Sequence, residues 1–272
     1  MPCTNGIDPR LTLACWRRCL GFLLHGVQME PHGTQLWEKY IATRYSEPQR
    51  HYHTLNHLEE MMGHLAHFQL SSEAAHRLPE TGARRLIVEL AMLFHDSVYD
   101  PQRKDNEECS CDWFRAFWAE SRDLAAALMV TDNARTECQT LLWDDPALAE
   151  AVEEGVVALI LQTKDHLSEQ QCDSRPWAAL GKGISADLAL FLDLDLAVLG
   201  SEPPRYREYA AEVRLEYAWL CDAEFARGRS AFLQGLLKYP CWYRTQFFHD
   251  KLEKVARANV TDELVTLRGH CS

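Results

Sequence analysis

The stretch Leu86-Ile-Val-Glu-Leu-Ala-Met-Leu-Phe-His-Asp-Ser-Val-Tyr-Asp100 decides the class of fold that we predict. Its apolar residues recur at the spacing of one helix face. These residues are Leu86, Ile87, Leu90, Leu93 and Phe94. We predict a helix that Gly82 opens and that ends at Tyr99-Asp100-Pro101, with the pair His95-Asp96 near its end.

Helical spacing continues through the rest of the chain, and no sustained alternation of apolar and polar residues indicates a sheet. Asn56 and Asp145 are the expected N-caps of two of these helices, and Gly200 is an expected C-terminal cap. We therefore predict one all-α domain, a helical bundle over residues 1–272. The further predicted helices are residues 11–24, 37–45, 56–68, 106–118, 124–142, 146–163, 185–199, 206–220, 222–238 and 245–258.

The charge balance argues against polyanionic partners. The chain has 28 Lys+Arg against 40 Asp+Glu, a net charge of -12, which repels a phosphate backbone. A small anionic substrate is compatible with this net charge, because a bound cation can reverse the electrostatic field inside one pocket.

No stretch approaches the roughly 20 apolar residues of a membrane span. The 10 irregularly spaced cysteines fit free thiols in a reducing cytosol. We expect a cytoplasmic protein without nucleic-acid or membrane partners.

The pair His95-Asp96 is the strongest local indication of chemistry. Adjacent side chains of a helix point about 100° apart, so both reach one metal only where the helix end opens into a cleft. Ionisable residues are costly to bury unless they are paired or bound to metal. The alternative is a histidine that caps its helix beside a surface aspartate.

Two further segments carry candidate ligands. His53 and His57 are four residues apart and could share a metal if one helix includes both, whereas His53 precedes the helix if Asn56 is its cap. Asp193 and Asp195 lie inside an apolar predicted helix, where a carboxylate needs a cation or a hydrogen-bond donor. An aspartate bonded to a neighbouring turn would satisfy the same requirement.

In the order H…HD…D, these residues resemble the HD superfamily, whose members hold a divalent metal by a histidine, a His-Asp doublet and a distant aspartate on a bundle of helices. Over about residues 36–235 the chain is also similar to one branch, the predicted metal-dependent HD phosphohydrolases. The stretches that carry the similarity are residues 45–57, 94–100, 106–107, 163–166, 192–200 and 206–217.

The resemblance implies roles for individual residues. It favours His57 over His53 as the first ligand, and Asp195 as the last, with Asp193 as the alternate. The implied metal ligands are therefore His57, His95, Asp96 and Asp195. Asp100 occupies the position of the catalytic acid or base in relatives, and Glu107 is a second candidate. His166, between the doublet and the last aspartate, leaves a second metal open.

The implied activity is hydrolysis of a small phosphate ester, such as a nucleotide or related phosphorylated metabolite, by water that a divalent metal activates. Mixed oxygen and nitrogen ligands suit Mn²⁺, Fe²⁺ or Co²⁺ better than Mg²⁺, and Zn²⁺ is a further option. Each Arg or Lys candidate for the phosphate is equally consistent with a solvated surface charge. The residues that we assign to substrate binding are Arg50, His53, Lys164, His166 and Arg214.

Two other functions fit the same residues. Some HD-fold proteins are di-iron oxygenases, and here His53 and His166 could supply the additional histidines that a second iron needs. A metal-binding module without enzymatic activity is the other alternative. The intact H…HD…D set argues against it, because a decayed enzyme has no reason to retain all the ligands.

Overall fold

The computed structural model describes residues 9–24, 30–74, 77–131, 142–167 and 184–269, and these ranges contain helices and no strand. The predicted all-α class is therefore confirmed. The elements are α1 (Arg10–Leu23), α2 (His32–Trp37), a short π-helix η1 (Glu38–Ala42), α3 (Thr43–Tyr45), α4 (Leu55–Leu70), α5 (Ala83–Phe94), α6 (Asn106–Thr131), η2 (Leu142–Asp144), α7 (Pro146–Gln162), η3 (Thr163–Asp165), α8 (Ile184–Leu196), η5 (Ala197–Gly200), α9 (Pro203–Glu216), α10 (Asp222–Leu237) and α11 (Gln246–Arg268).

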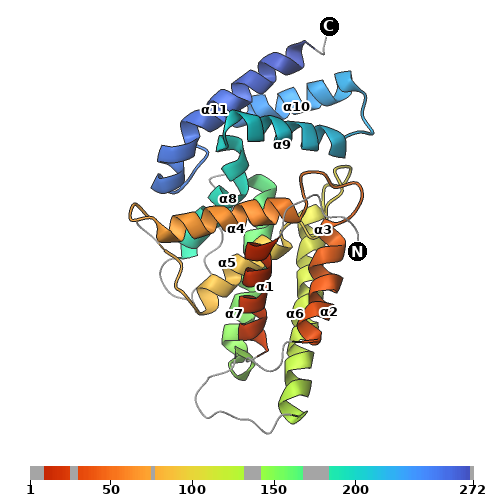
Figure 1. Cartoon of the computed structure of the whole chain (residues 1–272), viewed down its shortest axis with the longest axis vertical. Helices are drawn as coiled ribbons and strands as arrows, with labels where there is room; N and C mark the ends of the chain where they lie inside the picture. Colours follow the sequence, from red (N-terminus) through yellow and green to blue (C-terminus); the bar gives the residue numbers. More distant parts are fainter. Residues whose placement is uncertain (1–8, 25–29, 75–76, 132–141, 168–183, 270–272) are drawn as a thin grey trace.

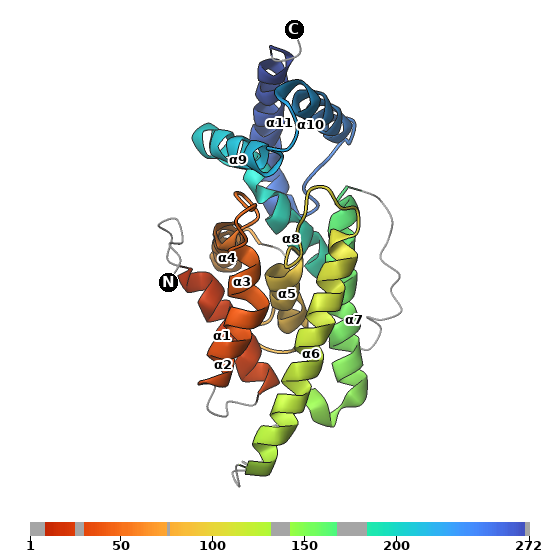
Figure 2. The same ribbon diagram turned by 90° about the vertical axis from the view of Figure 1, so that its right-hand side faces the viewer.

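Helix α5 is the centre of the bundle. It contacts α1, α4, α6, α7 and α8, and Figure 2 shows it enclosed by its neighbours. Every residue from Leu86 to Phe94 is buried, which explains why the helix is apolar on almost all sides. Its one buried charge, Glu89, pairs with Arg18 and Arg85. Because α5 is central, the pair His95-Asp96 that follows its last residue lies in the interior of the bundle.

Helices α9, α10 and α11 lie together at one end of the molecule, and α4 crosses between them and the bundle (Figure 1). Helix α8 and the short η5 connect the two parts, and η5 packs closely against α11. A Cβ added at Gly200 would lie 2.5 Å from Cβ of Leu252. Gly200 therefore permits close helix packing. It is the last residue of η5 and not the predicted C-terminal cap, which is Ser201.

Several predicted boundaries are wrong. Helix α5 ends at Phe94, before the doublet. The N-cap of α4 is Thr54 and not the predicted Asn56. The hydroxyl of Thr54 accepts from the backbone N–H of Asn56, which is one of the unpaired donors in the first turn of the helix. Helix α6 continues to Thr131, so the break that we predicted before Leu124 does not exist. Of the predicted helix at 124–142, residues 132–141 lie outside the described part.

Other expectations hold. Asp145 caps α7 by accepting from Leu148 N, with Pro146 at the first helical position. Each described cysteine is a free thiol. None of the described helices combines the length and the apolar character that crossing a bilayer requires.

Candidate metal centre

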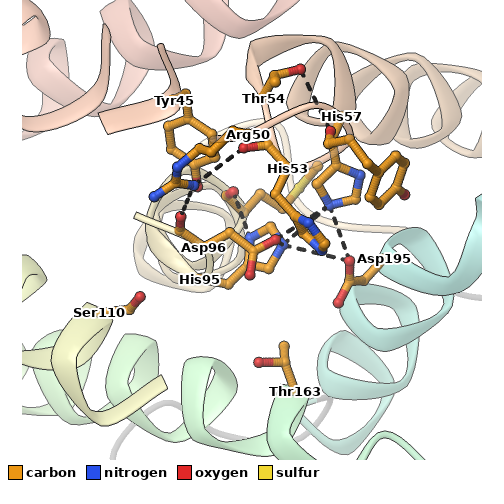
Figure 3. A network of polar contacts seen from close by, with 12 residues as sticks. Tyr45, Arg50, His53, Thr54, His57, His95, Asp96, Ser110, Thr163 and Asp195 are labelled. Atoms are coloured by element: carbon orange, nitrogen blue, oxygen red, sulfur yellow. Dashed lines mark hydrogen bonds and ion pairs between the residues drawn. The ribbon is translucent and has the colours of Figure 1, made fainter. Parts of the chain in front are cut away.

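Four predicted ligands from three helices converge on one point of the interior (Figure 3). His57 Nε2 lies 3.2 Å from His95 Nε2 and 3.1 Å from Asp195 Oδ1. Asp96 Oδ2 lies 3.0 Å from His95 Nε2 and 3.8 Å from His57 Nε2. The four side chains thus lie together in the interior, the arrangement that a shared metal would require.

The ends of the helices bring these side chains together. His57 lies in the first turn of α4, and Asp195 lies in the last turn of α8. His95 is the C-cap of α5, so Asp96 follows outside the helix. The helix end therefore lets adjacent residues face the same point, as the doublet requires.

The hydrogen bonding of His95 determines which of its ring nitrogens can bind a metal. Its Nδ1 lies 3.0 Å from the carbonyl oxygen of Met92, which favours a proton on Nδ1 and leaves Nε2 as the donor atom for a metal. Backbone carbonyls and carboxylates commonly orient metal-binding histidines in this way.

The electrostatics of the cluster favour a cation. Burial alone would lower the pKa of His95, but Asp96 and Asp195 raise it well above the usual 6.5. Burial would likewise raise the pKa of Asp195, but His95, His166 and His57 hold it well below its ordinary value. Against the same effect of burial, His95 and His53 likewise lower the pKa of Asp96, so both carboxylates favour the ionised form. A metal ion at this point would replace the proton that the carboxylates stabilise on His95.

Asp193, the alternate ligand, faces elsewhere. Its carboxylate accepts from Arg244 N at 2.7 Å, from Thr245 N at 2.7 Å and from Thr245 Oγ1 at 2.6 Å. Burial raises its pKa to about 6, although these donors act in the opposite direction. The side chain anchors the segment before α11. The geometry therefore favours Asp195, and Asp193 matches the predicted alternative of a carboxylate bonded to a turn.

The cluster borders a cavity of about 570 Å³. Its polar wall comes from the segment before α4, the ends of α5 and α8, the start of α6 and the segment around η3. Its other wall comes from η5, α9 and α10. This volume is in the range of small-molecule sites. The predicted site residues that line it are His53, Asp96, Glu107, Lys164, His166 and Asp195.

His53 is held in this wall by Glu216. Oε1 of Glu216 accepts from the backbone N–H groups of His51, Tyr52 and His53 at 2.8–2.9 Å, and its Oε2 lies 2.7 Å from His53 Nδ1. The imidazole also stacks on Tyr99, with centroids 3.8 Å apart. Burial alone would lower the pKa of His53, but Glu216 and Asp96 raise it.

His166, Lys164 and Glu107 line the cavity from the segment around η3 and from the start of α6. His166 Nε2 is 2.6 Å from Asp195 Oδ2, the oxygen that His57 does not contact. Lys164 lines the cavity but already pairs with Glu108. Glu107 lies in the first turn of α6, and of the two predicted proton-transfer residues it is the one on the wall.

Arg50 was predicted to bind substrate, but its side chain is fully buried and does not line the cavity. The guanidinium donates to the carbonyl oxygens of Asp96 at 2.6 Å, Ser97 at 3.1 Å and His53 at 3.2 Å. It also pairs with Glu47. These bonds tie the segment before α4 to the end of α5, so Arg50 organises the site without facing a ligand.

Arg214, predicted to bind substrate, and Asp100, predicted to transfer a proton, do not line the cavity either. Arg214 donates to the carbonyl oxygens of Tyr217 and Leu220 and pairs with Asp222, which joins the end of α9 to the start of α10. Asp100 Oδ1 accepts from Gln102 N at 2.9 Å, a local turn. Of the two predicted proton-transfer residues, Glu107 alone lines the cavity.

Comparisons of the chain with known protein families, curated proteins and solved structures found no match.

Two residues of the site escaped the sequence analysis. Glu216 is 4% exposed although it lies on a largely polar helix. In the sequence it was marked only by its place in segment 206–217, one of the stretches that carry the family resemblance. Its hydrogen-bond partners are more than 160 residues away in the chain. Tyr52 is 5% exposed, and its hydroxyl has no hydrogen-bond partner among the described residues. Its position between two histidines could have marked it.

Proposed function

We propose that the protein is a metal-dependent hydrolase of small phosphate esters, with a helical bundle of the HD type. The observation that carries the proposal is the convergence of two buried histidines and two carboxylates at one end of a cavity large enough for a small molecule. Phosphate esters fit because they need a charged site, and the overall charge of the chain disfavours longer polyanions.

The donor set fits a divalent ion of the Mn²⁺, Fe²⁺ or Co²⁺ type, held by His57, His95, Asp96 and Asp195. Such an ion would supply Lewis acidity toward a phosphoryl oxygen and lower the pKa of water. Two imidazoles and two carboxylates match its preference for mixed nitrogen and oxygen ligands. Zn²⁺ and Mg²⁺ are the further options for the same residues.

The remaining wall residues would act on the substrate. His53, held by Glu216 and stacked on Tyr99, would donate a hydrogen bond to a phosphate oxygen. Lys164 and His166 lie where they would contribute charge and a second donor. Glu107 would accept or donate the proton of the reaction, a contribution typically worth about 10²–10⁴-fold in rate.

The test distinguishes the carboxylates proposed to bind the metal from the acidic residues that do not. Purified protein is stripped with a chelator, reloaded with each metal in turn and assayed on a panel of phosphate monoesters. Asp96→Asn should lose metal and turnover, whereas Asp100→Asn, whose carboxylate lies outside the cavity, should keep both. Glu107→Gln should keep the metal and lose rate. Full turnover by Asp96→Asn would refute the metal mechanism.

A di-iron oxygenase is the second candidate, and the position of His166 favours it. His166 contacts Oδ2 of Asp195, whereas His57 contacts Oδ1, so His166 and Asp195 would help to hold a second ion. Iron content near two per chain, together with oxygen uptake and no phosphate release, would support this alternative. A protein that binds metal but shows neither activity on broad panels would support the non-enzymatic module.

A further inference from the structure

The cavity has two chemically different ends. The metal cluster and its neighbours form the polar end. The far wall is a mainly apolar chamber made by η5, α9 and α10. The residues that define it are Leu199, Val213, Leu220, Phe225 and Phe232, and Tyr209, Tyr217 and Arg229 line the same wall. Leu199, Val213 and Phe225 are at most 8% exposed, whereas Phe232 is 53% exposed. A ligand that fills the cavity would therefore bury an apolar group here.

The wall has little positive charge to offer beyond the polar end. Among the described lining residues, the Lys and Arg side chains are Lys164 and Arg229. Lys164 pairs with Glu108, and Arg229 pairs with Glu263 at 2.8 Å. The acids Asp96, Glu107 and Asp195 line the same cavity. Such a wall matches one phosphate near the metal better than a chain of several phosphates.

Tyr52 lies at the junction of the two ends. Its ring contacts His57, with centroids 4.8 Å apart, and Tyr209 of α9, with centroids 4.6 Å apart. Its buried hydroxyl has no hydrogen-bond partner among the described residues. The ring of Tyr52, and not its buried hydroxyl, therefore meets the cavity where the polar end passes into the apolar chamber.

We propose that this cavity selects a phosphate monoester of an apolar alcohol, with the phosphate at the cluster of His57, His95, Asp96 and Asp195 and the hydrocarbon against Leu199, Val213 and Phe225. The inference rests on the proposed function for its reaction, but the binding preference is a property of the wall itself. Sugars, and nucleotides with several phosphates, would leave hydroxyl groups or charges unpaired against this chamber.

The test measures binding separately from turnover. Methyl-, butyl- and hexylphosphonate, which cannot be hydrolysed as esters, are titrated calorimetrically into the metal-loaded full chain, alongside a hexylphosphonate with a terminal hydroxyl. The affinity should rise about two- to fourfold per methylene that is buried, and the hydroxylated chain should bind more weakly than hexylphosphonate. Equal affinity along the series, or the absence of binding throughout, would overturn the proposal.

Variants locate the effect in the chamber. Val213→Thr is nearly isosteric and adds a hydroxyl, so it should weaken hexylphosphonate about three- to tenfold and leave methylphosphonate unchanged. Phe232→Ser, at a half-exposed site, repeats the test where folding is not at risk. Val265→Thr, on α11 and 64% exposed, is the control and should bind like the wild type. Equal effects on the short and long ligands would contradict an apolar chamber.

The two proposals fail in different ways. If affinity rises with chain length but no alkyl phosphate is hydrolysed with any metal, the hydrolase proposal falls and the apolar preference stands. If sugar phosphates are hydrolysed faster than hexyl phosphate and chain length has no effect on binding, the apolar preference falls and the hydrolase stands.

Discussion

Asp193 and Asp195 are two residues apart in α8 and have different surroundings. Asp195 contacts His57, His95 and His166, whereas Asp193 accepts from the backbone before α11. The same substitution at each position therefore tests two separate functions, ligand binding and anchoring of a helix.

We expect Asp195→Asn to weaken metal affinity by at least about tenfold, because even changes behind the ligands cost that much. Asp193→Asn should keep metal affinity but lower the free energy of unfolding by about 1–2 kcal/mol, since one charged acceptor for the start of α11 is lost. Metal titration and urea unfolding of both variants provide the measurements. Loss of metal affinity in Asp193→Asn alone would reverse the assignment.

At the scale of elements, Glu216 of α9 fixes the segment that precedes α4. Its carboxylate accepts from three successive backbone N–H groups and from the ring of His53. Burial alone would raise its pKa, but His53 and these backbone donors lower it to about 2 from the usual 4.5. The lowered pKa means that folding stabilises the ionised form.

This pair predicts a pH dependence with a defined sign. The contribution of Glu216 is present above pH 4.5 and is lost as the pH falls toward about 2. The raised pKa of His53 gives a contribution that is complete below 6.5 and is lost as the pH rises through the folded-state value. The pair should therefore stabilise most between pH 4.5 and 6.5.

Glu216→Gln should remove this dependence and cost on the order of 3 kcal/mol, since one pKa unit corresponds to about 1.4 kcal/mol. Urea unfolding from pH 3 to 8 measures the loss, and the His53 resonance followed by NMR should titrate at lower pH in the variant. Glu208→Gln, on the same helix and with a side chain 69% exposed, is the control for a change of surface charge. An unshifted His53 titration would contradict the pairing.

The contact between η5 and α11 depends on Gly200. The Cβ of an alanine would lie 2.5 Å from Cβ and 3.0 Å from the backbone oxygen of Leu252, so a helix must shift. Gly200→Ala should cost about 1–3 kcal/mol by overpacking. Gly228→Ala, at a position where nothing lies within 4 Å of the added Cβ, is the matched control for denaturant unfolding. Equal stability of the two variants would refute the packing argument.

On the scale of the whole molecule, the candidate ligands join α4, α5 and α8, which are separate in sequence. Metal should therefore stabilise the bundle by binding only the folded chain. At about 100 times the dissociation constant the gain is about 2.7 kcal/mol. For a chain of this size we expect the melting temperature to rise by about 5–10 °C.

Scanning calorimetry with and without metal measures this shift. The shift should shrink toward low pH, because the raised pKa of His95 means that a proton competes with the metal. Asp195→Asn should lose most of the shift, and Asp193→Asn should keep it. A shift of equal size in Asp195→Asn would place the ion elsewhere.

The sequence by itself determined most of the helices, because helical periodicity and caps are properties of neighbouring residues. It located the buried helix that ends just before His95 and Asp96, and the resemblance to the HD superfamily named His57 and both aspartates as candidate ligands. It could not assign Arg50 to the support of a loop or choose between Asp100 and Glu107.

Only the tertiary structure decided which charged side chains face the cavity. That outcome depends on contacts between distant segments, such as Glu216 with residues 51–53 and Arg50 with the end of α5. A side chain is directed by the partners that satisfy it, and these partners lie up to 165 residues away. The pairing of Lys164 with Glu108 and the apolar chamber of η5, α9 and α10 arise in the same way, because burial is a property of packed elements.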